Sequence, residues 1–352
     1  FGNANNTPRV ARIDLKTFKT MEIIELPNSA GNHSSPFCTE NTEYVVAVTR
    51  FSVPVDANAD VPINTYKENF RGSISFISVD KEDGHMELAW QLRLPGINFD
   101  LARAGKAVSH DWFFFSCYNT EQANTLLEVN ASQRDKDFIM AVNWKKAEEL
   151  VAAGKGKKEP ANYAHNVMDE STHSATSTMM KEVIIIDPVE YPGIVYFIPC
   201  PKSPHGCDVD PTGEYIVGSG KLAAVIPVFS FAKIQKAITD KAFDEDYAGI
   251  PVIKYDAALY GEVKKPGLGP LHTEFDGKGN AYTSMFVSSE VVKWNIKDLA
   301  VLDRAPTYYS VGHICIPGGN TRSPWPKYLI AYNKITKDRY LPTGPELCQS
   351  AQ

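Results

Sequence analysis

Four histidines of the chain stand in closely similar local sequences, and this recurrence narrows the possible folds more than any other feature. Each follows a bend that contains glycine or proline, and each precedes a turn and an aromatic-anchored apolar run; they are His33, His205, His272 and His313. The spacings from histidine to tyrosine are 11, 10, 10 and 15 positions. One structural unit therefore recurs with the same residue type at its entrance. Such residues converge only if the units surround a common axis.

Short segments rich in β-branched and aromatic residues run through the whole chain. They predict strands at Arg9–Ile13, Tyr44–Thr49, Ser73–Val79, Trp112–Ser116, Glu182–Asp187, Ile194–Ile198, Ala223–Ile226, Val291–Trp294 and Tyr328–Tyr332. Glycine, proline, asparagine and aspartate turns separate them. Many short strands with a repeat of roughly 45–70 residues indicate a β-propeller of about five to seven blades. An all-β sandwich array is the nearest rival, but it gives no reason for a histidine at each entrance.

Two segments depart from this pattern and predict helical insertions, near 143–153 and near 229–238, because their apolar residues recur at helical spacing. The stretch 154–158, rich in glycine and lysine, predicts a solvated loop. The other histidines are weaker candidates for a shared site. His85 is in a turn, and His165 and His173 are in a polar loop; His110 is the hardest of these to dismiss.

Composition excludes several functional classes. The chain of 352 residues is 43% hydrophobic and 22% charged and carries a net charge of −6, so no basic excess indicates nucleic-acid binding. No apolar run reaches the ~18–20 residues that cross a bilayer. The chain begins at Phe1 and ends without a closing strand, and we expect it to be an excerpt of a longer protein.

The converging histidines predict a metal site. Neutral imidazole suits copper, zinc, iron and nickel, and a motif without carboxylates favours copper or zinc over magnesium or calcium. The spacing alone leaves copper and zinc both open. Cys200 and Cys207 flank His205, so they are either soft ligands or buried thiols on strands.

Several segments resemble nitrous oxide reductase, in its second or atypical branch, and the resemblance runs across essentially the whole chain. They are Lys202–Tyr215, Gly267–Ser284, Lys334–Arg339, Ser109–Phe115 and Asn143–Lys146. The resemblance implies an all-β, seven-bladed β-propeller, incomplete here and spanning residues 1–352. In that family a cupredoxin domain follows, which this chain lacks. The propeller holds a four-copper sulfide cluster (CuZ) through seven histidines, and the cupredoxin holds a dinuclear copper centre (CuA).

The resemblance also implies roles for individual residues of the copper site. His33, His205, His272 and His313 match four of the seven CuZ ligands. Lys293 matches a lysine near the cluster, where a fixed ammonium would stabilise developing oxide charge; the alternative is an exposed strand lysine. Asn320 ends a Gly-Gly-Asn segment that stands where typical members carry a carboxylate, so its role stays open.

Two calcium sites are implied in the same way. Tyr118 and Val129 would offer carbonyls and Glu121 a carboxylate to the first site, together with either Asp135 or Asp137. Lys334, through its carbonyl, and Glu346 match the second site. Oxygen-rich ligation of this kind suits Ca²⁺.

The implied function is copper-dependent reduction of nitrous oxide to dinitrogen and water, the last step of denitrification, in the periplasm. Electrons would come from a c-type cytochrome or cupredoxin donor through the CuA centre of the partner subunit in a head-to-tail homodimer. By itself the chain is expected to be inactive, because it lacks ligands and the CuA domain. The alternative is a non-catalytic β-propeller interaction module whose histidines only brace turns.

Overall fold

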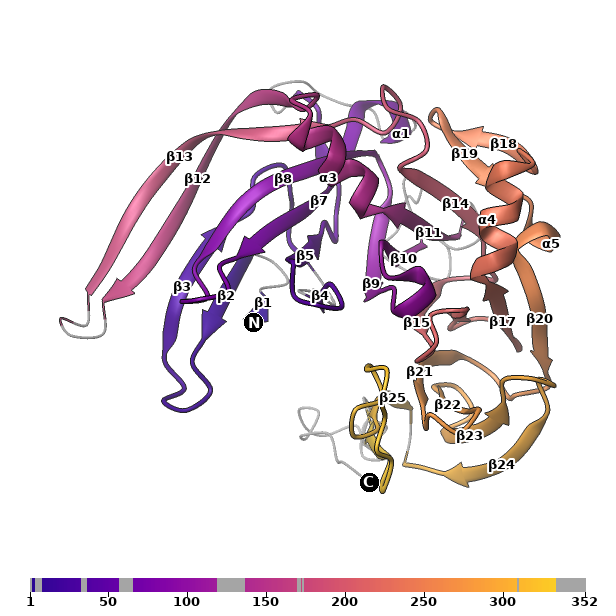
Figure 1. Cartoon of the computed structure of the whole chain (residues 1–352). Helices are drawn as coiled ribbons and strands as arrows, with labels where there is room; N and C mark the ends of the chain where they lie inside the picture. The colour runs from indigo at the N-terminus through magenta and orange to yellow at the C-terminus, as the bar shows by residue number, and fades with distance from the viewer. Residues whose placement is uncertain are drawn as a thin grey trace, which may run out of the picture.

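The structure is a computed structural model, and it describes residues 2–3, 8–32, 37–56, 66–118, 137–169, 172, 174–308 and 310–333. The described strands form five sheets that are arranged around a common centre (Figure 1). The chain is therefore an all-β propeller, as the recurring strand pattern predicts. The sheets follow the chain in order around the arc.

The first sheet has ten strands in the order β1-β2-β3-β12-β13-β8-β7-β5-β4, and β6 pairs with β7. Their bounds are β1 Gly2–Asn3, β2 Arg9–Ile13, β3 Thr20–Glu25, β4 Phe37–Cys38, β5 Tyr44–Val48, β6 Val53–Pro54, β7 Phe70–Val79, β8 Met86–Pro95, β12 Lys157–Asp169 and β13 Ser174–Ile186. The short helix α1 (Tyr66–Asn69) precedes β7. β12 and β13 form a long hairpin that extends away from the other sheets at the left of Figure 1.

The second sheet has six strands in the order β18-β19-β14-β11-β10-β9. They are β9 Asn98–Ala104, β10 Trp112–Tyr118, β11 Phe138–Asn143, β14 Val195–Pro199, β18 Phe243–Tyr247 and β19 Ile250–Ile253, with a 3-10 helix, η2 (Ala107–Ser109), between β9 and β10. The chain leaves the second sheet after β11, forms the β12–β13 hairpin of the first sheet, and returns to the second sheet at β14.

The remaining sheets are smaller. The third is β15 (Pro204–Val209), β16 (Tyr215–Gly220), β17 (Val225–Ser230) and β20 (Leu259–Lys264); the fourth is β21 (Pro270–Phe275), β22 (Asn280–Met285), β23 (Glu290–Asn295) and β24 (Val301–Pro306); the fifth is β25 (Val311–Cys315) with β26 (Ile330–Asn333). Adjacent strands within each are antiparallel.

In the second to fifth sheets the first strand, which is β9, β15, β21 or β25, lies toward the common centre. β15 packs against β9 on one side and β21 on the other, and β21 packs against β25 (Figure 1). β15 and β21 are buried along their whole length, whereas the outer strand β24 is mostly exposed. At Gly206 the two inner strands come so close that a Cβ would lie 1.9 Å from the Leu271 carbonyl oxygen. Glycine is required there because any side chain would separate β15 from β21.

Aromatic side chains fill the space between the blades. In the first blade Trp90 stacks on Phe76 with ring centroids 3.8 Å apart, and Tyr44, which opens β5, contacts both rings edge-on. In the fourth blade Trp294 is fully buried, and its Nε1 donates to Thr283 Oγ1 at 2.9 Å. The tyrosine or tryptophan in each unit therefore anchors the sheet whose first strand faces the centre.

The two expected helical insertions are present as α3 (Trp144–Ala152) and α4 (Phe231–Thr239), and a third helix, α5 (Tyr255–Ala258), follows β19. Each long helix begins after a polar cap. The Asn143 side chain accepts from Lys146 N at 2.9 Å, and Ser230 Oγ accepts from Lys233 N at 3.1 Å. These caps satisfy backbone N–H groups that the first helical turn leaves unpaired.

Two expectations near the hairpin were wrong. The stretch 154–158 is a loop only as far as Gly156, because Lys157 and Lys158 begin β12, where their exposed ammonium groups pair with Glu190 and Glu182. His165 is on β12, not in a loop. The segment is polar, but pairing with β13 and β3 supplies the backbone hydrogen bonds that make it a strand.

Candidate metal centre

Three of the four recurring histidines lie together at the centre of the arc. His205 comes from β15, His272 from β21 and His313 from β25. The ring centroids of His205 and His272 are 4.7 Å apart, those of His272 and His313 are 4.2 Å apart, and those of His205 and His313 are 6.3 Å apart. A possible ligand nitrogen from each lies within 4.8 Å of the other two. His33 lies outside the described residues.

The site is formed by inner strands that are close neighbours. Each histidine is near the start of its strand, so the three side chains lie at a similar height along the central axis. His205 and His272 are almost completely buried, whereas His313 is exposed. The three side chains therefore form a cluster that is closed on the side of β15 and β21 and open on the side of β25.

A buried carboxylate orients the first of these rings. Asp100, on β9, is 1% exposed and hydrogen-bonds to His205 Nδ1. Arg50 pairs with its other oxygen, with Nη1 and Oδ1 3.1 Å apart. Since Asp100 holds Nδ1, the other nitrogen of His205, Nε2, is directed at His272 Nε2, 3.0 Å away. A histidine held in this way presents its Nε2 lone pair to a metal ion.

Asp100 had no place among the sequence candidates, although a signal exists. It follows the bend at Pro95 and Gly96 and stands near the start of an inner strand, as the three histidines do in their own blades. The second blade therefore carries a carboxylate at the position where the next blades carry an imidazole. A search restricted to histidine passes over it.

The donor set fits a transition metal. Within 4.8 Å the three residues offer imidazole nitrogens and no carboxylate oxygen, which suits copper or zinc and does not suit calcium or magnesium. The residues of the described structure therefore fit the copper that the sequence resemblance implies. Their role as copper ligands stays a prediction.

A buried ionic network lies farther along the same inner strands. Arg103 Nε, on β9, is 2.9 Å from Asp208 Oδ1 on β15, and Asp208 Oδ2 accepts from Thr273 N at 2.7 Å. Lys106 Nζ donates to the Val209 carbonyl oxygen at 2.6 Å. These contacts connect β9, β15 and β21 beyond the histidines.

Two members of this network have strongly shifted pKa values. Burial raises the pKa of Glu274, on β21, to about 7, although Arg103 opposes this shift, and Asp208 adds to it. Burial lowers the pKa of Lys106 to about 8, and the charge of Arg103 lowers it further. Among the described residues Glu274 Oε2 has no hydrogen-bond partner. The interior beside the histidines is therefore poorly solvated.

The other predicted residues of the copper site lie farther out. Lys293 is on β23, in register with Tyr282 of β22, which is in register with Glu274 of β21. Its backbone is therefore about two strand spacings, roughly 10 Å, from β21. The Lys293 Nζ lies over the Tyr282 ring, 5.7 Å from its centroid, beside a cavity of about 260 Å³. Asn320 borders another cavity, of about 390 Å³, with Lys106 among its neighbours.

Most of the predicted calcium ligands fall outside the described residues, namely Glu121, Val129, Asp135, Lys334 and Glu346, and of Tyr118 only the backbone, at the end of β10, is described. Asp137 is described, and its Oδ2 accepts from Ser203 N at 2.8 Å. The calcium sites stay predictions.

The remaining histidine and cysteine candidates contact neighbouring residues that give them structural roles. His110 Nδ1 is 2.9 Å from Glu40 Oε2 and its Nε2 is 3.3 Å from Glu43 Oε1, beside the Trp144 ring. Cys200 and Cys207 are buried in an apolar cluster, and burial raises the pKa of both thiols well above the ordinary value. The interpretation as buried thiols therefore holds for this pair.

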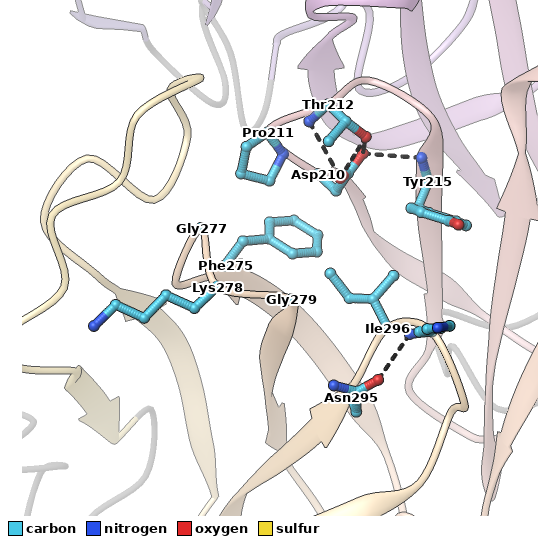
Figure 2. A pocket seen from close by; sticks show the side chains of 11 residues that line it. Asp210, Pro211, Thr212, Tyr215, Phe275, Gly277, Lys278, Gly279, Asn295 and Ile296 are labelled. Carbon is cyan, nitrogen blue, oxygen red and sulfur yellow. Dashed lines mark hydrogen bonds between the residues drawn. The ribbon is translucent and has the colours of Figure 1, made fainter.

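A separate pocket of about 370 Å³ lies at the other end of β15 and β21 (Figure 2). Its polar groups already serve local turns. The Asp210 carboxylate accepts from Tyr215 N at 2.9 Å and from Thr212 Oγ1 at 2.7 Å, and Asn295 Oδ1 accepts from Lys297 N at 2.9 Å. These bonds are among those drawn in Figure 2, around a largely apolar space next to Phe275 and Ile296.

Among the described residues no helix is long and apolar enough to span a membrane.

Comparison with known proteins points in the same direction as the histidine cluster. Residues 304–352 match the family model described as nitrous oxide reductase propeller repeat. The chain is 29% identical over 364 residues to a nitrous-oxide reductase of Pseudomonas fluorescens, an alignment that covers 98% of this chain and 50% of that protein. It is 31% identical over 359 residues to a nitrous-oxide reductase of Cupriavidus necator, covering 96% of this chain and 50% of that protein.

The chain thus spans about half the length of the curated relatives it matches. Among solved structures, a functionally unknown protein from Desulfotomaculum acetoxidans aligns with a TM-score of 0.46 at 10% identity, covering 99% of this chain and 78% of that one. A likeness of this size carries no argument about function.

Proposed function

We propose that this chain is the histidine-bearing propeller part of a copper enzyme that reduces nitrous oxide to dinitrogen and water. The observation that carries the proposal is the convergence of His205, His272 and His313 from three successive blades. The similarity to proteins named nitrous-oxide reductase supports the choice of substrate. The low identity and half coverage leave the activity to experiment.

In this proposal His205, His272, His313 and His33 hold copper, together with further ligands from outside the chain. When bound, a cluster of several copper ions would supply the two electrons that the reduction needs. The chain provides rigid ligands, because each histidine is on an inner strand that its neighbours hold in register.

Asp100 and Arg50 have a positioning role in the proposal. The Asp100 carboxylate keeps the proton of His205 on Nδ1, so Nε2 remains a ligand, and Arg50 fixes the carboxylate from the other side. Such partners of a ligating histidine commonly raise the metal affinity by roughly 10- to 100-fold. The Lys293 ammonium lies over the Tyr282 ring, so in this proposal it acts on the copper site only through long-range electrostatics.

The rest of the implied system belongs to the same proposal. It comprises the CuA domain, a c-type cytochrome or cupredoxin donor, a head-to-tail homodimer, bound calcium and a periplasmic location. Each follows from the resemblance of the sequence. Light scattering and calcium analysis of the copper-loaded whole protein would test the dimer and the calcium.

The first experiment measures copper binding to the chain itself. Metal-free protein is titrated with Cu²⁺, and electron paramagnetic resonance is used to detect nitrogen coupling from imidazole ligands. We expect His272→Ala to remove the imidazole signal of this site. His173→Ala is the matched control, because His173 lies outside the recurring motif, and it should leave the signal unchanged.

The second experiment measures nitrous oxide reduction by the whole protein with the same two variants. Loss of both copper and activity in His272→Ala, with both kept in His173→Ala, would support the proposal. Full activity and full copper content in His272→Ala would refute it. In that case the histidines only brace the inner strands, as in a non-catalytic propeller.

A further inference from the structure

A second cluster of possible metal ligands lies in the first sheet, in a different blade from the three histidines. Glu22 comes from β3, His85 from the residue before β8, and His165 from β12. A possible ligand atom from each lies within 4.8 Å of the other two. The three residues are far apart in sequence, and none of them belongs to the recurring motif of the copper site.

The carboxylate at the centre of this cluster is completely buried. Glu22 is 0% exposed, and its Oε1 lies 2.9 Å from His85 Nδ1 and 2.6 Å from His165 Nε2. The two imidazole rings stack on each other with centroids 5.3 Å apart and an interplanar angle of 25°. Both rings therefore direct a nitrogen at the same oxygen atom.

The other oxygen of Glu22 already has partners. Arg12 Nε donates to Oε2 at 3.1 Å, and Met86 N donates to both oxygens, at 3.0 Å to Oε2 and at 3.1 Å to Oε1. Burial acts to raise the pKa of Glu22, but hydrogen bonds from His165, Met86 and Arg12 outweigh it and hold the pKa below its ordinary value. Oε1 of Glu22 is therefore the atom that both histidines contact.

We propose that Glu22, His85 and His165 form a second metal site, one that binds Zn²⁺ or a similar first-row divalent cation. Two imidazole nitrogens and one carboxylate oxygen are a known donor set for zinc with an open fourth position. Calcium and magnesium prefer all-oxygen sites, so they fit poorly. The His85 side chain is 48% exposed, which gives the cation and a water ligand access from solvent.

A small movement converts the cluster into a coordination sphere. Ligand atoms around a tetrahedral zinc ion lie about 3.3 Å apart, given bonds of about 2.0 Å. The present separations of 2.9 and 2.6 Å are shorter, so the rings must withdraw by a few tenths of an ångström. His85 can do so because it follows the turn at Gly84 and is half exposed.

A cation at this place would join β3, β12 and the turn before β8, which are far apart in the sequence. β12 reaches β3 through the pairing of His165 with Ile24, and the turn before β8 approaches the same strand through Met86 and Glu22. A bound ion would connect β12 of the long hairpin to β3 and to the turn before β8. Since binding favours only the folded state, zinc should raise the unfolding temperature of the chain.

The test uses the whole metal-free chain and zinc ions alone. Crystals soaked in zinc are examined by anomalous scattering at the zinc edge, and the number of zinc ions bound in solution is measured by calorimetry. We expect an anomalous peak between Glu22, His85 and His165. Glu22→Gln should lose one equivalent of zinc and the zinc-dependent rise in unfolding temperature.

Two variants serve as controls. Glu25→Gln changes another carboxylate of β3, which pairs with Arg9 and accepts a hydrogen bond from Ala164 N. This variant should bind zinc as the parent chain does. His272→Ala should also keep this equivalent, because His272 belongs to the copper site. A failure of the copper proposal therefore leaves this result unaffected.

The proposal is overturned if zinc produces no peak at the three residues, or if Glu22→Gln binds as many zinc ions as the parent chain. In either case the cluster is only a hydrogen-bonded contact between β3, β8 and β12. If Glu22→Gln fails to fold, as judged by circular dichroism, the anomalous map of the parent chain decides alone.

Discussion

Replacing Glu274 with glutamine should make the metal-free chain more stable at neutral and alkaline pH and leave its stability unchanged near pH 4. Glu274 is 3% exposed, and burial raises its pKa from 4.5 to about 7. The folded state therefore holds this proton more tightly than the unfolded chain does. Stability that depends on the proton is present at low pH and is lost as the pH rises from about 4.5 to about 7.

The size of the effect follows from the shift. Each unit of pKa difference corresponds to about 1.4 kcal/mol, and between pH 5 and pH 8 the group passes from mostly protonated to ionised in the folded state. The parent chain should therefore lose about 2–3 kcal/mol of unfolding free energy through this group alone. Solvent screening does not reduce the figure much, because the carboxyl is buried. Glu274→Gln mimics the protonated form at every pH.

The assay is urea unfolding followed by tryptophan fluorescence at several pH values, with a chelator present. The two curves should nearly coincide at pH 4, and the variant should be more stable by about 1 kcal/mol at pH 5 and by about 3 kcal/mol at pH 8. Glu87→Gln, at an exposed position of β8, is the control and should follow the parent at every pH. A difference between Glu274→Gln and the parent that stays constant from pH 5 to pH 8 would refute the reasoning.

Two further predictions concern the copper site. Asp100→Asn should fold normally but bind copper about 10- to 100-fold more weakly, because His205 Nδ1 loses its carboxylate partner; equal affinity in a chelator competition would show that Asp100 does not orient the ligand. Gly206→Ala should cost about 1–3 kcal/mol of unfolding free energy, because the new Cβ meets the Leu271 carbonyl oxygen and separates β15 from β21. Its copper affinity should fall as well, and a variant that matches the parent in both respects would contradict the close approach of the two strands.

Much of the fold is readable from local sequence. Arg9–Ile13 is β2 with the same bounds as expected, and the helix after Asn143 begins where its polar cap predicts. These elements are marked by side chains a few positions apart, either alternating apolar residues or a cap with its first turn. The convergence of His205 with His272 was predictable for a similar reason, since each blade repeats its own entrance sequence.

What the sequence did not reveal depends on partners far away along the chain. β12 is a strand because β13 and β3 flank it, although its own residues are mostly polar. Glu22, His85 and His165 carry no common motif, and only the packing of three strands unites them. Asp100 is likewise one aspartate among many until β9 is placed beside β15. No pattern within a window of a few residues encodes such contacts.

The β12–β13 hairpin belongs to the first sheet although it follows β11 of the second sheet in sequence, and this affects the order in which the chain can fold. As the chain leaves the ribosome, β3 and β8 emerge long before residue 186, so both stand for many seconds as strand edges without their final neighbour. Closing so long a loop is slow, and exposed edges of this kind recruit strands from other molecules. The first sheet is therefore completed only after β9, β10 and β11 of the second sheet have been synthesised, and until then its open strand edges favour association with other molecules.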